Sequence, residues 1–468
     1  MKPEPMKRLL ILALISGCIS AAAANPDNIV PRPDSVTLSR GSLRLAGISL
    51  KCDPRMDSTA VKAVSRFAAD LSLACGKTCP VSSPVGIDAS VAGGSAKGLI
   101  FLLDRSLAPE EYRIETESRT GVIYASGAEG FIHAIQTLRQ LLPGSLSGGE
   151  AEEGARWTLP CCTISDRPES EYRGLMLDCS RHFWSTDEIK RCLDMMERFK
   201  LNRFHWHLTD DQGWRMEVEA LPLLGSMASW REGTAISGEP GTSDHIRYGG
   251  CYSRADILEI VRYAGDRGIS VIPEITMPGH FMAALSAYPE TGCSGGPYRT
   301  STDWSVSTQP VCAGKEESYV FLETVLSEVA ALFPSEYVHI GGYDCHPEEW
   351  EKCAACQRKI AELGFSDKPG LSAEEQLLGY FTGRVISMLA ADGKKAICRD
   401  EALARTDPDL METCGTLTMS TDGAFTEIYS GEEMIGIQQD IWTEELETPA
   451  QLERALEEIL PGLAERQW

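Results

Sequence analysis

Carboxylates, histidines and aromatic residues recur together in short clusters from residue 178 onward. The clusters are residues 178–182 (DCSRH), 205–211 (HWHLTDD), 274–280 (EITMPGH), 339–344 (HIGGYD) and 442–444 (WTE). Side chains of these types can transfer protons, stabilise a developing charge and form an apolar wall for a ligand. A single cluster can arise by chance, but their repetition indicates one functional site.

The clusters lie at the ends of apolar segments that alternate with amphipathic ones. The expected strands are residues 172–178, 203–209, 270–276, 337–340, 395–399, 416–420 and 436–441, and the expected helices are residues 186–199, 253–267, 317–332, 373–392 and 449–460. This alternation predicts an α/β fold with a parallel sheet, and over residues 167–468 it favours a closed (β/α)8 TIM-type barrel. The carboxyl ends of barrel strands meet at one face, so the clusters should converge there. A doubly wound open sheet is the alternative, although no glycine-rich phosphate loop supports it.

The region before the barrel has a different pattern. Residues 25–143 combine short strands with two amphipathic segments, which predicts a small α+β domain. A Gly- and Glu-rich stretch follows, and we assign residues 144–166 to a linker.

The first 24 residues have the composition of an export signal. Lys2, Lys7 and Arg8 precede a short apolar run, and small residues extend to Ala24. Cleavage before Cys18 would make a lipoprotein, whereas cleavage after Ala24 would release an ordinary mature chain, and both alternatives stay open. We therefore expect an exported protein that is periplasmic, secreted or an outer-membrane lipoprotein, with no transmembrane span.

Length and charge limit the remaining possibilities. The chain of 468 residues is long enough for two domains, and its net charge of -24 would repel nucleic acid and anionic membranes. A neutral partner such as a glycan is compatible with this charge. The sequence does not indicate an oligomeric state.

Sixteen cysteines are many for a reducing compartment but acceptable in an oxidising one. Cys293 and Cys312 could staple a loop, and Cys353 and Cys356 form a CxxC pair. No second CxxC or histidine pair follows at metal-ligand spacing, so a disulfide or plain thiols are favoured over a metal site.

The order and spacing of the motifs resemble glycoside hydrolase family 20, the β-N-acetylhexosaminidases. The motifs are RGLMLD (173–178), RHF (181–183), FHWHLTDDQGWR (204–215), PEITMPGH (273–280), HIGG (339–342) and WTE (442–444). Residues 25–143 also resemble the α+β domain that precedes the barrel in that family. Agreement over this many motifs is far more specific than any single short pattern.

The resemblance implies removal of terminal N-acetylglucosamine or N-acetylgalactosamine from glycans with retention of configuration. In this family the acetamido oxygen of the sugar is the nucleophile, and an adjacent Asp-Glu pair supplies the stabilising charge and the general acid. Here the pair is Tyr343-Asp344. Asp344 keeps an acidic group on a side chain that is one methylene shorter than glutamate, and Tyr343 is a neutral phenol that cannot neutralise an oxazolinium ion.

Other family positions are kept. By resemblance, Arg181 and Glu444 would bind sugar hydroxyls, and Trp442 would form a wall of the sugar site. Asp210 and His280 would support the acid. The family uses no cofactor and no metal, and we expect His205 and His207, which share a strand face, to be core or supporting histidines.

Several positions depart from the family. Thr276 replaces an acidic residue, and Arg399 and Thr421 stand where aromatic residues are expected. Residues 422–434 are much shorter than the counterpart that normally carries a seventh strand and a tyrosine for the acetamido oxygen, so the seventh unit is expected to be incomplete. Tyr429 is the candidate for that tyrosine in this sequence.

Two functions follow from this balance, and a third outcome remains. The chain is either an impaired or altered N-acetylhexosaminidase or a catalytically silent glycan-binding homologue. A decayed chain without a stable fold is the remaining possibility, since a missing barrel segment would expose sheet edges.

Overall fold

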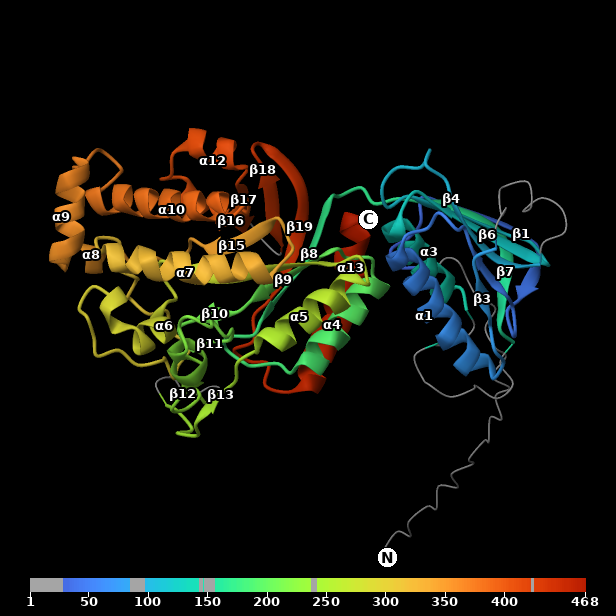
Figure 1. Cartoon of the computed structure of the whole chain (residues 1–468), viewed down its shortest axis with the longest axis horizontal. Helices are drawn as coiled ribbons and strands as arrows, with labels where there is room; N and C mark the ends of the chain where they lie inside the picture. The colour runs from blue at the N-terminus through green and yellow to red at the C-terminus, as the bar shows by residue number, and fades with distance from the viewer. Residues whose placement is uncertain (1–27, 85–96, 143–145, 147–155, 237–241, 422–424) are drawn as a thin grey trace, which may run out of the picture.

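The structure is a computed structural model that describes residues 28–84, 97–142, 146, 156–236, 242–421 and 425–468. Figure 1 shows a sheet domain built from the first part of the chain beside a barrel built from the rest. The expected export signal (residues 1–24) and residues 144, 145 and 147–155 of the expected linker lie outside the described residues.

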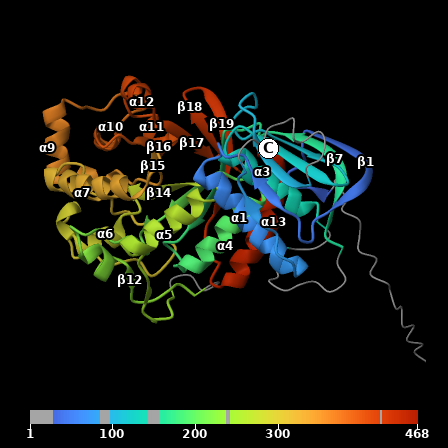
Figure 2. The ribbon, with the colours of Figure 1, turned by 45° about the vertical axis from the view of Figure 1, so that its right-hand side comes forward.

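The first domain is a seven-stranded sheet with helices against one face. Its strand order is β1-β7-β5-β6-β4-β2-β3. The strands are β1 (Ser35–Arg44), β2 (Leu50–Cys52), β3 (Val81–Ser82), β4 (Gly98–Leu103), β5 (Tyr112–Thr116), β6 (Thr120–Ala125) and β7 (Thr158–Asp166). Helices α1 (Ser58–Cys75) and α3 (Ala128–Gln140) cover the face that is turned toward the barrel (Figures 1 and 2).

The expected linker at residues 144–166 was too long. Residues Thr158–Asp166 form β7, which pairs antiparallel with both β1 and β5. Leu159 and Ile164 of β7 are fully buried in the core of the first domain. The strand was missed because it adjoins the Gly- and Glu-rich stretch and because apolar and polar residues alternate only weakly in its sequence, TLPCCTISD.

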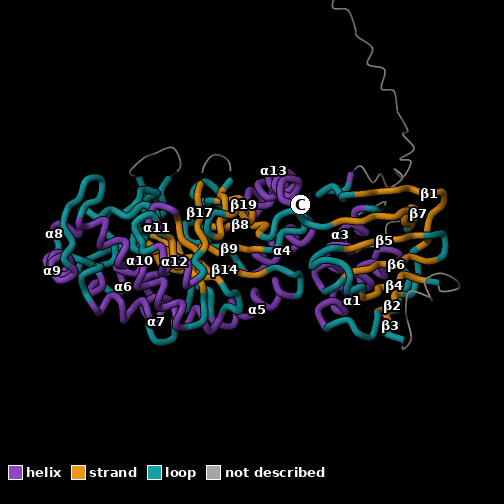
Figure 3. The backbone as a smooth tube through the Cα atoms, turned by 90° about the horizontal axis from the view of Figure 1, so that it is seen from above, coloured by secondary structure: helices purple, strands orange, loops and turns teal. Residues whose placement is uncertain are grey.

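The rest of the chain forms a closed eight-stranded barrel, which confirms the TIM-type prediction. The strands are β8 (Tyr172–Asp178), β9 (Arg203–His207), β14 (Ser270–Met277), β15 (Tyr337–Gly341), β16 (Lys395–Arg399), β17 (Leu417–Thr421), β18 (Thr426–Ser430) and β19 (Glu433–Ile441). Helices surround the strands, as Figure 3 shows. They include α4 (Thr186–Arg198), α5 (Arg254–Gly265), α7 (Glu316–Leu332), α10 (Ala373–Ala391) and α13 (Pro449–Gln467).

The barrel departs from a regular (β/α)8 pattern at its seventh strand. β18 runs antiparallel to both β17 and β19, so these strands form consecutive hairpins. A parallel connection needs a dozen or more residues, and the chain from Thr421 to Glu433 is too short for a crossover helix and a strand together. The seventh unit is thus a reversed strand that closes the barrel without a helix in the described residues around it.

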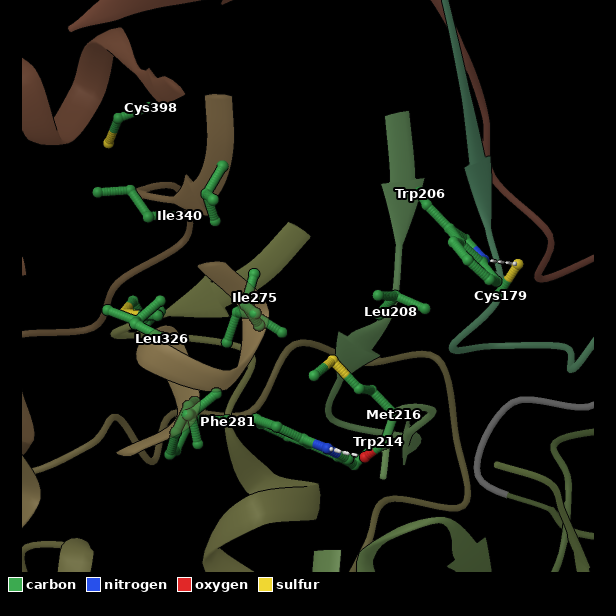
Figure 4. Packing of buried hydrophobic residues seen from close by; sticks show 14 of the residues in the cluster. Cys179, Trp206, Leu208, Trp214, Met216, Ile275, Phe281, Leu326, Ile340 and Cys398 are labelled. Atoms are coloured by element: carbon green, nitrogen blue, oxygen red, sulfur yellow. Dashed lines mark hydrogen bonds between the residues drawn. The ribbon is translucent and has the colours of Figure 1, made fainter. Parts of the chain in front are cut away.

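Alternation along the strands separates two cores. Outward-facing residues such as Trp206, Ile275 and Ile340 pack under the helices, and Figure 4 shows the indole of Trp206 pointing to Cys179, to whose sulfur it donates a hydrogen bond of 3.2 Å. The inward-facing apolar residues form a small cluster inside the barrel: Tyr172, Ile272, Ile397, Leu417, Met419 and Ile428. The inward positions nearer the carboxyl ends of the strands are polar, and these build the site.

No helix in the described part of the chain is both long enough and apolar enough to cross a bilayer.

Candidate active site

An acid and a histidine are joined to a buried aspartate at the carboxyl end of the barrel. Asp210 lies in the short strand β10 (Thr209–Asp210), and its Oδ1 accepts a hydrogen bond of 2.9 Å from Nδ1 of His280. Nε2 of His280 donates to Oδ2 of Asp344 at 3.3 Å. Asp210 and His280 are buried, whereas the Asp344 side chain is 55% exposed. The arrangement therefore places one accessible carboxyl group at the outer end of a buried polar chain.

Glycines deliver Tyr343 and Asp344 to this place. β15 ends at Gly341, and Gly341 and Gly342 have φ values of 75° and 87°, in the left-handed region that favours glycine. A Cβ on Gly342 would lie 2.4 Å from the Cys398 sulfur, so a larger residue cannot pass this point without moving β16. The close passage lets the chain turn inward at the strand end.

The electrostatics of the pair place a proton on His280. Burial alone lowers the pKa of His280, but the charge and hydrogen bond of Asp210, together with the hydrogen bond to Asp344, raise it to about 10. The hydrogen bond from His280 lowers the pKa of Asp344 below its usual 3.8, against a smaller opposing effect of burial. At neutral pH the resting site thus contains an imidazolium beside a carboxylate.

Arg181 connects this chain to the other expected binding residues. Its Nη1 lies 2.9 Å from Oδ2 of Asp210, and its Nε lies 4.0 Å from Oε1 of Glu444. The guanidinium carbon lies 4.9 Å from the centre of the Trp442 ring. Arg181, Trp442 and Glu444 therefore surround one point beside Asp210.

Tyr343 contacts both halves of the site. Its ring centre lies 5.0 Å from that of His280 and 6.5 Å from that of Trp442. Its hydroxyl donates to Oε1 of Glu274 at 3.2 Å. Burial, followed by the charge of Glu274, raises the pKa of Tyr343 well above its usual value, so the side chain is a neutral phenol.

Glu274 is the centre of the buried network and is the residue whose role the sequence did not reveal. Its Oε2 accepts from His207 at 2.5 Å and lies 2.9 Å from Nε2 of His205, and its Oε1 lies 3.0 Å from Nδ1 of His339. Nε2 of His207 lies 3.0 Å from Oδ2 of Asp210, so the network continues into the hydrogen-bonded series Asp210–His280–Asp344. In the sequence, the only sign of this role was that Glu274 is a charged residue within an apolar strand. Its partners His205, His207 and His339 lie on other strands, so the sequence did not identify them.

Two groups of histidine and carboxylate side chains at the candidate site could hold a cation. His205, Glu274 and His339 form one group, and Asp210, Asp211 and His280 form the other. Within each group the donors already bind one another or their neighbours, and Arg181 adds a positive charge beside Asp210. These donor sets fit a hydrogen-bonded proton network better than a metal centre.

Comparison with known proteins decides the family. The catalytic-domain model of glycosyl hydrolase family 20 matches residues 170–422, which is more than half of the chain. The chain belongs to glycosyl hydrolase family 20. Domain 2 of the same family matches residues 27–167, so the first domain is also a family 20 domain and includes β7.

Individual family 20 relatives agree with this assignment. A beta-hexosaminidase of Porphyromonas gingivalis is 36% identical over 379 residues, covering 80% of this chain and 45% of that protein. A beta-hexosaminidase of Akkermansia muciniphila is 37% identical over 304 residues, covering 64% of this chain and 58% of that protein. The chain spans about half the length of these relatives.

Solved family 20 structures match nearly the whole chain. The beta-N-acetylhexosaminidase of Streptomyces coelicolor superimposes with a TM-score of 0.75 and 28% identity, covering 95% of this chain and 92% of that one. The exo beta-N-acetylglucosaminidase of Vibrio harveyi, solved with N-acetylglucosamine, also gives a TM-score of 0.75, with 27% identity and coverage of 95% and 74%.

The structure brings together all seven residues that the sequence singled out for this family 20 site: Arg181, Asp210, His280, Tyr343, Asp344, Trp442 and Glu444. Their individual roles remain predictions. The family 20 catalytic match ends at residue 422, where β17 gives way to the reversed strand, and Trp442 and Glu444 lie beyond it.

Two of the family 20 departures have a clear structural counterpart. Nη2 of Arg399 lies 3.0 Å from Oδ2 of Asp440, and its guanidinium lies 5.5 Å from the centre of the Tyr343 ring, so a charged pair stands where an aromatic residue was expected. Thr426 and Ile428 point into the barrel, and Tyr429 therefore lies on the outer face of β18, where its hydroxyl bonds the Glu427 side chain. Tyr429 cannot serve the sugar site from that face.

Proposed function

We propose that this family 20 chain is an N-acetylhexosaminidase that removes terminal N-acetylglucosamine or N-acetylgalactosamine from glycans at an impaired rate. The observation that carries the proposal is the hydrogen-bonded chain from Asp210 through His280 to Asp344, which ends in an accessible acid. Arg181, Trp442 and Glu444 beside it supply polar and apolar contacts of the kind that hold a pyranose ring.

The reaction follows from the position of these groups. Asp344 gives its proton to the glycosidic oxygen while the acetamido oxygen of the sugar attacks C1, so the C1–O bond breaks and the aglycone leaves as an alcohol. The sugar becomes an oxazolinium ion. Water then attacks C1 and loses its proton to Asp344, which restores the acid and gives a product with retained configuration.

Two features of the site slow this reaction. His280 keeps Asp344 ionised in the resting state, so only a small fraction of molecules holds the proton that the leaving oxygen requires. Tyr343 offers a phenol where the family has a carboxylate, and the loss of one preorganised charge costs about 3 kcal/mol of transition-state stabilisation. The charge of Glu274 does not replace it, because three histidines surround that carboxylate.

The test is the stereochemistry and rate of hydrolysis of N,N'-diacetylchitobiose by the purified mature protein, followed by proton NMR. We expect slow release of N-acetylglucosamine as the β-anomer before mutarotation. Glu348→Gln is the matched control, because it removes an exposed carboxylate from the start of helix α8 (Glu348–Lys352), just after Asp344 in the chain, and should leave the rate unchanged. Release of the α-anomer first, or an ordinary enzymatic rate, would contradict the proposal.

A silent glycan-binding protein is the second candidate, and the Tyr343–Glu274 hydrogen bond favours it because it holds a neutral phenol against a carboxylate that three histidines already surround. This candidate predicts that calorimetry detects N-acetylglucosamine binding that Trp442→Ala abolishes, while no hydrolysis occurs in the wild type or in the variant with the family pair restored. Hydrolysis by the wild type would exclude it.

We also propose that the protein is exported and acts in the periplasm, outside the cell or as an outer-membrane lipoprotein. The support is the basic, apolar and small-residue order of the first 24 residues. The mass of the mature chain, measured from cells, would separate a lipidated Cys18 from cleavage after Ala24. A full-length chain retained in the cytoplasm would refute export.

A further inference from the structure

Four cysteine sulfurs converge at one point away from the sugar site. Cys293 follows the short helix η4 (Pro289–Thr291), Cys312 precedes α7, and Cys353 and Cys356 lie at the start of α9 (Ala354–Leu363). Cys312, Cys353 and Cys356 are buried and Cys293 is partly buried. All four sulfurs lie within 4.8 Å of one another.

The spacing of the sulfurs matches the edges of a tetrahedron around a metal ion. The sulfur of Cys312 lies 3.7 Å from that of Cys353 and 3.6 Å from that of Cys356, and the Cys293 and Cys356 sulfurs are 4.0 Å apart. A zinc–sulfur bond of about 2.3 Å in tetrahedral geometry requires sulfurs about 3.8 Å apart. The cluster thus already has the size of a tetrathiolate zinc site.

The backbone around the cluster is built for this close approach. A Cβ on Gly314 would lie 2.2 Å from the carbonyl carbon of Ala355, so only glycine lets the turn after Cys312 reach the start of α9. The backbone amide of Gly314 donates a hydrogen bond to the Cys312 sulfur. The turn therefore brings both a close backbone approach and a hydrogen-bond donor to the cluster.

Paired disulfides fit this arrangement less well. Cys312 is almost equally distant from Cys353 and Cys356, and Cys356 is also in contact with Cys293. No pair is singled out by proximity. One central ion would use all four sulfurs at once.

We propose that Cys293, Cys312, Cys353 and Cys356 bind one Zn²⁺ in a closed structural site. Each thiol loses its proton on binding, so four thiolates complete the tetrahedral shell and no position remains for water or substrate. No oxidant is needed, because the sulfurs stay reduced. The proposal is independent of whether the barrel hydrolyses a glycan.

The ion would join two loops of the barrel, one of which carries Asp344. One loop follows β14 and runs to α7, and the other follows β15 and carries Asp344 on its way to α9. A hydrogen bond of 3.1 Å from Nε1 of Trp350 to the Val311 carbonyl already links these loops beside the cluster. Zinc would strengthen this link and hold the loop of Asp344 in place.

The experiment is metal analysis of the full chain purified without chelator or added metal, by plasma mass spectrometry. We expect about one zinc per chain, and a lower melting temperature once a chelator removes it. Cys312→Ser and Cys356→Ser should each lose the zinc. Cys414→Ser, which alters a partly buried thiol outside the cluster, should keep it.

Titration of the wild type covers the case in which the cysteine variants do not fold. A mercurial that modifies thiols should release the zinc into a colorimetric chelator in step with the loss of four protected thiols. Peptide mapping that shows disulfides among these four cysteines, or a zinc content well below one per chain in reduced and folded protein, would overturn the proposal.

Discussion

The proton required for hydrolysis is held by His280 rather than Asp344 in the resting site. The hydrogen bond between them couples the two groups, since an imidazolium donor favours the carboxylate form of Asp344. The shortened acid thus has two handicaps, a reduced reach and a low fraction of the protonated form.

The first prediction concerns pH. Because the pKa of Asp344 lies below 3.8 and that of His280 near 10, no group of this pair titrates between them. We expect kcat/KM to fall steadily as pH rises from about 4 through neutrality, since the protonated fraction of Asp344 falls about tenfold per pH unit above its pKa. A pH–rate profile of the hydrolysis measures this, and an optimum near neutral pH would contradict the assignment of the acid.

The second prediction restores the family pair. The double variant Tyr343→Asp, Asp344→Glu should raise kcat by at least about tenfold, because it returns both a charge for the oxazolinium and the reach of the acid. Tyr343→Phe is the matched control, since it changes the same position without adding charge and should give no gain. An unchanged rate in the double variant would mean that the pocket limits the reaction instead, and Arg399, 5.5 Å from the Tyr343 ring, is one altered residue in that pocket.

The seven site residues could be found from the sequence because each belongs to a motif at a strand end. Glu274 belongs to the same motif as His280, but its three histidine partners could not be assigned from the sequence, and neither could the cysteine cluster. Cys293 and Cys312 lie in one loop and Cys353 and Cys356 in another, so neither pair has metal-ligand spacing with the other along the chain. Only folding of the two loops brings the four sulfurs together.

Among the elements, the reversed strand β18 explains how a shortened family 20 barrel still closes. Alternation identified β17 and β19, whereas the five residues of β18 (TEIYS) contain little apolar character and were not recognised as a strand. Hairpin pairing on both sides supplies hydrogen bonds that a missing strand would have left open. The fold therefore does not require the decayed chain that a gap in the barrel would imply.

The third prediction tests the ion pair that spans this region. Arg399 and Asp440 are both about nine-tenths buried, and Oδ2 of Asp440 also accepts from Thr426 of β18. Arg399→Met would leave a buried carboxylate without its cation and should lower the free energy of unfolding by about 3 kcal/mol. Urea unfolding measures this, and the double variant with Asp440→Asn should recover part of the loss. Equal losses in the single and double variants would exclude coupling between the two residues.

At the scale of the whole molecule, a buried ion pair joins the first domain to the barrel. Nζ of Lys200 in the barrel lies 2.8 Å from Oδ2 of Asp166 in β7, and both side chains are fully buried. The hydroxyl of Tyr112 and the indole of Trp468 bind the same carboxylate. The domain contact thus depends on β7, the strand that the sequence had assigned to a linker.

The fourth prediction measures this contact. Lys200→Met should destabilise the protein by about 3–5 kcal/mol, because it leaves the Asp166 carboxylate buried without a cation. Lys62→Met is the matched control. Lys62 pairs with Asp266 across the same two domains at 54% exposure, and its loss should cost less than about 1 kcal/mol. Similar melting temperatures for the two variants would contradict a structural role for the buried pair.

The sequence predicted the two domains better than the boundary between them. Strand and helix periods identified the barrel and the preceding α+β domain, because each period reflects a buried face. The boundary between them was misplaced, since β7 becomes recognisable only through its pairing with β1 and β5.

The most direct test of the central claim compares leaving groups in the Asp344→Asn variant. If Asp344 is the general acid, kcat/KM should drop about 100-fold or more for N,N'-diacetylchitobiose, whose sugar alcohol must be protonated as it leaves. It should drop far less for p-nitrophenyl N-acetyl-β-D-glucosaminide, whose phenolate leaves readily without a proton. Equal losses on both substrates, or no loss on either, would show that Asp344 does not deliver the proton.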